Sequence, residues 1–410
     1  MNKVLESLLE KDVQGAVACT MNNIVTILKF DEALNGIFFN EMSGKVDAEG
    51  ELPWKRNSDG WSSTDVSNFE LYLEKKYGIY SPSKSRDAMM AYLATEKRKN
   101  PIRDYLKGLE WDGNCRLDEL VATCFQVDES DYARATVRKT FVAAIARVCN
   151  PGIKFDTMLV LCGPQGVGKS TFFRRFSKGW YSDSLTISDM KDKSAAEKIQ
   201  GVWITELGEL AGIKKVDVET VKAFLSRADD QYRIPYGVYV DTHLRNGILV
   251  GTTNSTDGFL RDVTGNRRFW PIFINNIGTK PIWTFSEYEI DQIWAEAYKY
   301  YLEGEPLFLD EELEITACKV QNMAMETDPR EGIVRDYLRD LKSNRTCMMQ
   351  IWCECLHKDR CSMKRKDSYE LEGIMKHIDE WELYSGNVSG KMRLAEYGIQ
   401  RAYIRKGIYD

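Results

Sequence analysis

The sequence predicts an α/β fold with a parallel sheet flanked by helices, extended by a smaller unit at each end of the chain. Three observations predict it. A short apolar run, residues 158–162, leads through a glycine-rich turn into a helical pattern, which is the order of a parallel α/β unit. Further apolar segments and helical patterns alternate after it, with the strands at 202–204, 247–252 and 269–274 and the helices at 195–200 and 216–226. The pattern changes before about residue 100 and after about residue 307.

Length and composition are those of a globular protein with more than one domain. A chain of 410 residues is too long for one compact core, so we expect two or three domains. No apolar run approaches the length of a bilayer span, and the N-terminal segment lacks the apolar core of a signal peptide. We therefore expect a cytoplasmic protein with no membrane partner, whose ten cysteines are mostly buried rather than disulfide-bonded. The net charge of −6 argues against coating of the whole surface by nucleic acid but leaves room for a local basic patch or channel.

Residues 1–100 are expected to form an α+β unit. Residues 24–30 and 36–40 predict two strands joined by a polar turn. Residues 62–65 offer N-caps for a helix that runs to residue 77, and residues 85–97 predict a second helix. We find no catalytic constellation in this unit and predict no function for it.

Residues 101–306 are expected to form the second part of the chain. Asn100-Pro101 marks its start. Helical patterns at 117–125 and 132–148 then lead up to Pro151-Gly152, just before the apolar run at 158–162. We expect this helical block to pack against the parallel sheet.

Residues 307–410 are expected to form the third part. Two helical patterns, at 310–325 and 333–341, precede a segment in which Gly386 and Gly390 predict a hairpin. Helices followed by a hairpin resemble a winged-helix module. Four residues of zinc-binding types also lie here, but their spacing does not match the usual ligand pairs, and a structural role is favoured for Cys353, Cys355, His357 and Cys361.

The glycine-rich turn carries the most specific motif in the chain. Its sequence, Gly163-Pro164-Gln165-Gly166-Val167-Gly168-Lys169-Ser170, fits the P-loop pattern at every fixed position, and a helix beginning at Thr171 follows. Backbone N–H groups in such a turn cradle phosphate oxygens together with the positive end of the helix dipole. Lys169 is expected to reach the β- and γ-phosphates, and Ser170 is expected to hold Mg²⁺. We therefore predict ATP and Mg²⁺ as ligands, with the loop and Thr171 binding the nucleotide.

Two later strand ends supply further catalytic candidates. Residues 201–206 place Glu206 at the end of an apolar strand, where a carboxylate can orient Mg²⁺ or the attacking water. Glu209 is either a second acid or a surface residue, and the sequence does not separate these alternatives. Asn254 lies at the tip of another buried strand, where its amide can hydrogen-bond the γ-phosphate or hold the lytic water.

Basic residues later in the same part are candidates for contacts with the phosphate groups of a nucleotide or of nucleic acid. Arg267 and Arg268 come just before a strand and are arginine-finger candidates, although one of them could be a salt-bridge partner. Residues 232–237 predict a hairpin with the aromatic and basic groups, Arg233 and Tyr236, that can bind single-stranded nucleic acid. An ordinary solvated loop is the alternative.

These motifs together resemble the virulence-associated protein E family. The segments that carry the resemblance are residues 100–101, 111–113, 151–152, 163–170, 203–210, 233–237, 251–254 and 264–270. Members of the family are encoded by bacteriophages, prophages and mobile islands. They are similar to superfamily 3 helicases, which carry an AAA+ ATPase core and act as hexameric rings on DNA.

The resemblance implies a role for each matching residue. Lys169 and Ser170 take the Walker A roles, and Glu206 takes the Walker B role, although Thr205 precedes it where another acid is usual. Asn254 corresponds to sensor 1, and Arg267 or Arg268 corresponds to the finger. The B′ motif, which leads into a DNA-contacting hairpin, corresponds to Lys222, Ser226 and Asp229.

The expected activity is therefore that of an ATP-dependent DNA helicase or translocase of a bacteriophage or mobile genetic element, acting in DNA replication. We expect it to act in the bacterial cytoplasm on single-stranded or forked DNA as a homo-oligomer, most simply a hexamer. The alternative is an ATP-switched regulatory protein that binds DNA or a partner without unwinding. A nucleotide kinase shares the P-loop but is disfavoured, because no lid or acceptor base for a small substrate is apparent.

Overall fold

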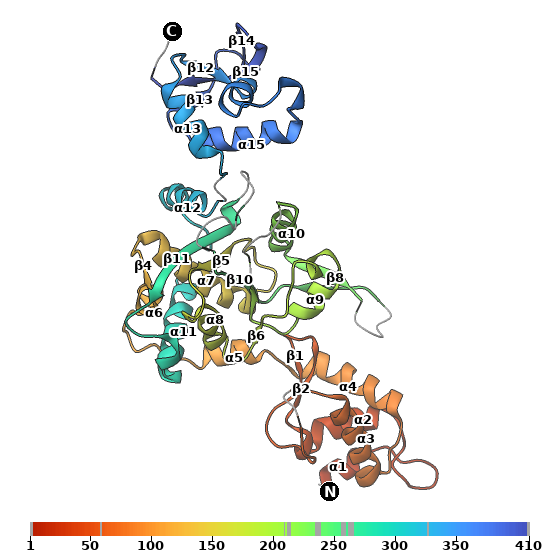
Figure 1. The fold of residues 1–410 in the computed structure, drawn as a ribbon. Coiled ribbons are helices and arrows are strands. Elements are labelled where there is room, and N and C mark those ends of the chain that lie inside the picture. Colours follow the sequence, from red (N-terminus) through yellow and green to blue (C-terminus); the bar gives the residue numbers. More distant parts are fainter. Residues whose placement is uncertain are drawn as a thin grey trace. The chain divides into compact units, whose positions relative to one another are not determined.

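The structure is a computed structural model that describes residues 3–57, 60–208, 210, 215–233, 239–255, 260, 266–325 and 328–407. The chain forms two compact units (Figure 1). The larger unit comprises Met1–Thr256 and Arg267–Asn322, and the smaller comprises Asp257–Asn266 and Met323–Asp410. Glu209 and Tyr236, two of the candidate residues, lie outside the described residues.

The larger unit is built on a six-stranded sheet with the strand order β4-β11-β5-β10-β7-β6. All neighbouring pairs are parallel except the antiparallel edge pair β4–β11. Strands β5 and β10 are buried at every position, as expected for parallel strands covered on both faces. The predicted α/β fold with a parallel sheet is thereby confirmed. The strands are β4 (Phe125–Val127), β5 (Met158–Cys162), β6 (Tyr181–Ser182), β7 (Ile204–Leu207), β10 (Ile248–Thr253) and β11 (Phe269–Ile277).

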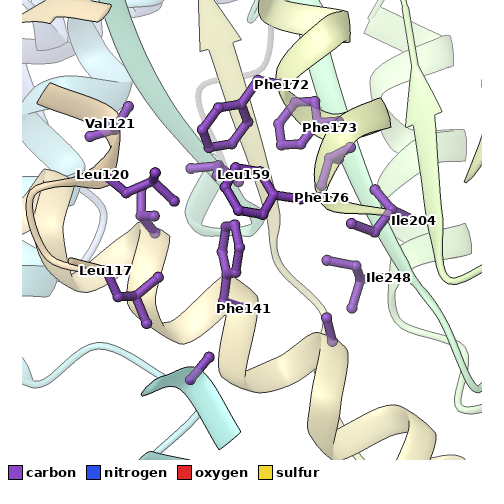
Figure 2. Packing of buried hydrophobic residues seen from close by; sticks show 14 of the residues in the cluster. Leu117, Leu120, Val121, Phe141, Leu159, Phe172, Phe173, Phe176, Ile204 and Ile248 are labelled. Atoms are coloured by element: carbon purple, nitrogen blue, oxygen red, sulfur yellow. The ribbon is translucent and has the colours of Figure 1, made fainter. Parts of the chain in front are cut away.

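Helices flank this sheet. One of them, α8 (Lys169–Phe176), follows β5 and is held by packing of its aromatic side chains against a neighbouring helix. The rings of Phe172 and Phe176 pack against Phe141 of α7 (Asp131–Cys149) (Figure 2), and Phe141 and Phe176 meet edge to face with ring centroids 4.9 Å apart. Burial of each such side chain is worth about 1.5–3 kcal/mol, so α8 is firmly held. The other helices are α5 (Pro101–Lys107), α6 (Leu120–Cys124), α9 (Ser194–Ile199), α10 (Lys215–Leu225), α11 (Glu287–Leu302) and α12 (Glu311–Met323). No helix within the described ranges is long and apolar enough to span a bilayer.

The N-terminal lobe of the larger unit has a hydrophobic core of its own. Its small sheet has the order β2-β1-β3, and α4 packs against β1 and β3. The elements are α1 (Lys3–Leu8), α2 (Met21–Phe30), β1 (Ile37–Asn40), β2 (Lys45–Ala48), α3 (Ser63–Tyr77), α4 (Pro82–Glu96) and β3 (Arg98–Lys99). The helices expected at 62–77 and 85–97 are confirmed as α3 and α4.

The strand predicted at residues 24–30 is wrong, because this segment lies in α2. The hydroxyl of Thr20 caps the helix by accepting a hydrogen bond from the backbone N–H of Asn23 at 3.1 Å. Ile24, Ile27 and Leu28 recur at helical spacing and are buried together. The helix expected at 117–125 is also shorter than predicted and forms only as α6.

The smaller unit has a core of its own around the strand β15. Strands β12 and β13 pair with β15 in antiparallel fashion, and β14 pairs with its other half. The predicted hairpin is formed by β14 and β15, whereas Gly386 and Gly390 lie in the loop before β14. The elements are α13 (Glu331–Asp340), β12 (Arg345–Cys347), α14 (Met348–Gln350), α15 (Arg365–Lys376), β13 (Trp381–Leu383), β14 (Lys391–Leu394) and β15 (Gly398–Arg405).

Candidate active site

The glycine-rich loop, residues 163–170, joins the carboxyl end of β5 to the first turn of α8. Gly166 and Gly168 have φ angles of 84° and 96°, in the left-handed region where a side chain is strained. A Cβ atom on Gly163 would lie 2.4 Å from the carbonyl oxygen of Ile274 in β11. Glycine is therefore required for the turn and for the close approach of β11. The turn brings the first N–H groups of α8, which have no partner within a helix, to the edge of the sheet.

Four of the predicted residues meet at this edge. Because β10 lies between β5 and β7 and all three strands are parallel, their carboxyl ends lie side by side. The ammonium of Lys169 donates hydrogen bonds to Asn254 Oδ1 at 3.0 Å and to the carbonyl oxygens of Gly163 and Pro164 at 2.8 and 2.7 Å. The hydroxyl of Ser170 donates to Glu206 Oε1 at 2.7 Å.

The two charged groups of the site are held away from water. Lys169 is 7% exposed and Glu206 is 2% exposed. Burial lowers the pKa of Lys169, and the charge of Glu206 acts in the opposite direction. Buried charges are weak stabilisers of a fold, since removing them from water costs as much as their attraction returns. Two buried charged side chains at the carboxyl edge of a parallel sheet are therefore typical of a binding or catalytic site.

Two further hydroxyl groups complete the surroundings of Glu206, and sequence reasoning missed both. Thr252 Oγ1 donates to Glu206 Oε1 at 2.6 Å, and the phenol of Tyr181 donates to Glu206 Oε2 at 2.5 Å. Burial, followed by the hydrogen bond to Glu206, raises the pKa of Tyr181 above its usual value. Thr252 lies in β10, two residues before Asn254, and this closeness to a predicted site residue is a signal that could have found it. Tyr181 lies in a two-residue strand without a motif, so no local signal pointed to it.

The structure does not bring the arginine pair to this edge of its own chain. β11 runs parallel to β5 with Phe269 opposite Met158, so Arg267 and Arg268 precede the strand at the amino edge of the sheet. The five residues of β5, at about 3.3 Å each, separate that edge from the loop by about 16 Å. The side chain of Arg267 is exposed.

Arg268 is partly engaged at the amino edge. Its Nε donates to Ser226 Oγ at 3.0 Å and lies 3.8 Å from Asp156 Oδ2. Both arginines line a cavity of about 410 Å³, together with Lys154 and Phe308. The pair thus presents positive charge beside a surface cavity rather than at the glycine-rich loop.

Beyond α10, β8 (Asp229–Tyr232) pairs in antiparallel fashion with β9 (Asp241–Leu244), and we refer to this pair as the β8–β9 hairpin. Most of the segment predicted as a hairpin, residues 232–237, lies outside the described residues. Arg233 follows β8 and is exposed, as is Tyr239 before β9. Lys222 is only 4% exposed, and its ammonium lies 3.2 Å from Glu219 Oε1. In this conformation Arg233, unlike Lys222, reaches the surface.

A buried ion pair that sequence reasoning missed fixes the base of this hairpin to α10. The guanidinium of Arg245 binds the carboxylate of Asp230 through Nε at 2.8 Å and Nη2 at 3.1 Å. It also donates to the carbonyl oxygen of Phe224 at 2.5 Å and lies 4.0 Å from the centroid of that ring. Residues 15 positions apart meet here, which no local pattern predicts.

The cysteine and histidine group near residue 357 does not converge on a common point. Across the part of the chain that the structure describes, no cluster of three or more His, Cys, Asp or Glu residues could hold a metal ion. Cys355 is buried and its thiol donates to the carbonyl oxygen of Ile333 at 3.6 Å. We interpret these residues as structural.

The family follows from a comparison of the sequence with known domains. The profile of the virulence-associated protein E-like domain matches residues 106–326. The chain belongs to this family. The matched range contains the glycine-rich loop, Glu206, Asn254 and both arginines, so the resemblance that the motifs indicated is confirmed.

Comparisons with curated proteins and with solved structures do not extend this assignment beyond the virulence-associated protein E-like family. No curated protein matches the chain. Two apo structures of the NrS-1 C-terminal region are similar to it at 13% and 14% identity, with TM-scores of 0.46 and 0.45. The first alignment covers 86% of this chain and 85% of the other, and the second covers 90% and 96%. Likeness at this level carries no argument about function.

Proposed function

We propose that this protein is an ATP-hydrolysing motor, an ATP-dependent DNA helicase or translocase that serves the replication of a bacteriophage or mobile genetic element. One observation carries the proposal, the hydrogen-bonded convergence of Lys169, Ser170, Glu206 and Asn254 beside the glycine-rich loop. Cradling of phosphates by a loop and lysine, with a metal-holding hydroxyl and an acid nearby, is the arrangement that phosphoryl transfer needs. Family membership agrees with it.

The residues present fit ATP. Among the described residues, the partners of the Lys169 ammonium are neutral oxygens, and replacing them with phosphate oxygens gives this buried group charged partners. The N–H groups of the loop and of the first turn of α8, which includes Thr171, bind further phosphate oxygens. Asn254, which already contacts Lys169, then lies beside the γ-phosphate. Binding and orientation of the triphosphate are therefore functions of this edge of the sheet.

The residues also fit Mg²⁺, which when bound neutralises charge on the β- and γ-phosphates. A hydroxyl and a carboxylate are oxygen ligands of the kind that Mg²⁺ takes, directly or through water, and Ser170 and Glu206 provide them. Glu206 also orients the attacking water. Tyr181 and Thr252 hold the carboxylate in position for this task.

We assign the core to the AAA+ class and the smaller unit to a winged-helix-like module. The position of β10 between β5 and β7, with Asn254 directly after its last residue, supports the first assignment. The order α13, β12, α14, α15 and then the antiparallel strands β13, β14 and β15 supports the second. Lys364, Arg365 and Lys366 at the start of α15 support a nucleic-acid role for that unit, because a basic helix end is an electrostatic footprint for phosphates.

The arginine pair supports a ring. Since Arg267 and Arg268 lie at the sheet edge opposite to the loop, they act as fingers only on the site of a neighbouring copy. The proposed assembly is a homo-oligomer, a hexamer by analogy with superfamily 3 helicases, with each active site at a subunit interface. Single-stranded or forked DNA is the proposed partner, contacted by the β8–β9 hairpin.

One observation favours a second candidate, an ATP-switched regulatory protein that does not unwind DNA. Both oxygens of Glu206 accept hydrogen bonds from hydroxyl groups, which leaves fewer lone pairs to accept a hydrogen bond from an attacking water. Hydrolysis is then slow until this network rearranges. ATPase assays with and without single-stranded DNA, followed by strand displacement on a forked substrate, separate the candidates. The motor requires stimulation and displacement. Stimulated hydrolysis without displacement supports the switch, and absence of hydrolysis in every condition contradicts both.

A further inference from the structure

A half-exposed tryptophan lies against the glycine-rich loop. Trp283 is 51% exposed, although a large aromatic side chain is usually well buried. A Cβ atom built on Gly168 would lie 2.9 Å from Cζ3 of the indole, which places the ring in contact with the main chain of the loop. Gly168 directly precedes Lys169, so the indole borders the residues that contact phosphate in the proposed function.

The backbone beneath this indole is fixed on both sides. Trp283 lies in the short helical turn η4 (Ile282–Thr284) that follows β11. Ile282 and Phe285 are buried, and Arg175 of α8 donates to the carbonyl oxygen of Phe285 at 2.7 Å. The segment is therefore tied to the same helix that begins at the loop. The backbone that carries the exposed ring is held in place, which favours a preorganised contact surface.

We propose that Trp283 is the platform on which the base of the bound nucleotide stacks. The inference rests on the proposed function and specifies its substrate. Phosphates held by the loop and by the first turn of α8 leave the nucleoside to extend past the outside of the loop, where the indole offers an apolar π-face. Every base has such a face, so stacking binds nucleoside triphosphates without strict choice of base. Purines, which offer the larger ring, bind more tightly than pyrimidines.

The experiment compares two ligands that differ only in the nucleoside. Binding of ATP and of inorganic tripolyphosphate, each with Mg²⁺, is measured by calorimetry for the wild-type chain, Trp283→Ala and Trp283→Phe. Tyr80→Ala, which removes an aromatic ring that is 63% exposed in the N-terminal lobe, is the matched control. Trp283→Ala weakens ATP binding about tenfold or more and leaves tripolyphosphate binding within about twofold. Trp283→Phe retains most of the ATP affinity, and Tyr80→Ala changes neither ligand.

Three outcomes overturn the proposal, and only the last of them also contradicts the proposed function. If Trp283→Ala binds ATP as tightly as the wild type, the base does not stack there. If it loses ATP and tripolyphosphate equally at an unchanged melting temperature, the indole supports the shape of the loop instead. If the wild-type chain binds neither ligand, the phosphate-binding role of the loop fails, and the proposed function fails with it.

Discussion

The two edges of the central parallel sheet hold their charges in different ways. At the carboxyl edge, the ammonium of Lys169 and both oxygens of Glu206 are buried and hydrogen-bonded within the chain. At the amino edge, Arg267 is exposed, and Arg268 contacts the hydroxyl of Ser226 and the carboxylate of Asp156 beside a cavity. The first edge is the proposed nucleotide site. The second edge presents two arginines that are too far from the glycine-rich loop of their own chain to contact a phosphate bound there. This difference favours a proposed active site that is divided between two copies.

The largest effect is expected at the carboxyl edge. Lys169→Ala removes the buried positive charge from the proposed phosphate site, so ATP hydrolysis falls about a thousandfold or more. Phosphate release measures the loss. Lys193→Ala, which removes a lysine whose side chain is 67% exposed, is the control and keeps full activity. A Lys169→Ala chain that hydrolyses ATP at the wild-type rate contradicts the assignment of the loop.

Glu206→Gln tests the second charge of the same edge. The amide keeps the size of the side chain but loses the carboxylate, so the variant is expected to bind ATP and to lose turnover. Nucleotide binding and phosphate release are measured on one preparation. Normal hydrolysis by this variant makes Glu209 the candidate acid instead.

The comparison between the edges is sharpened by mixing two inactive chains. One chain carries Lys169→Ala and the other carries Arg267→Ala with Arg268→Ala. Mixed assemblies place an intact arginine pair against an intact loop at some interfaces, and an arginine supplied in trans is worth about a thousandfold or more in turnover. ATPase activity of the mixture is therefore expected to exceed that of either chain alone. Co-assembly without recovery shows that the arginines do not act across the interface.

A smaller effect is expected from Tyr181→Phe, which removes one hydroxyl from the surroundings of Glu206. The carboxylate loses the donor that holds Oε2, so kcat is expected to fall about tenfold while KM for ATP changes little, as for a group that positions an acid or base. Steady-state kinetics across pH 6–10 measure it. Because the pKa of Tyr181 is raised above its usual value, the phenol stays protonated through this range, and the wild-type profile has no alkaline limb from it. Equal losses in kcat and in ATP affinity contradict a positioning role.

The smallest effect is expected at the β8–β9 hairpin, where an exposed basic side chain, Arg233, can be compared with a buried one, Lys222. Arg233→Ala is expected to weaken single-stranded DNA binding a few-fold and to reduce the salt slope by about one unit, because one phosphate contact is lost. Lys222→Ala removes a buried side chain and is expected to lower the melting temperature as well as DNA binding. Fluorescence anisotropy over a salt series makes the measurement. Unchanged binding for both variants removes the hairpin from the DNA path.

The sequence predicted the sheet and most of the site because their signals are local. An apolar strand, a glycine-rich turn and the polar tips of two buried strands are each contained in a few residues. The helix α2 was missed because Ile24, Val25 and Thr26 favour a strand, whereas the Thr20 cap and burial of one face override that preference. Tyr181 could not be predicted, since only the pairing of β6 with β7 brings it to Glu206.

The carboxyl end of α10 is a shared anchor for the hairpin and for one finger candidate. Asp230 of the hairpin is clamped by Arg245, which also grips the carbonyl and ring of Phe224, and two residues later the hydroxyl of Ser226 accepts the hydrogen bond from Arg268. A displacement of the hairpin therefore pulls on the same turn of chain that restrains this arginine. The position of the hairpin and the position of the Arg268 side chain are therefore coupled through residues 224–226. In the proposed assembly, this coupling would transmit a movement of the DNA-contacting hairpin to the arginine that faces the neighbouring copy.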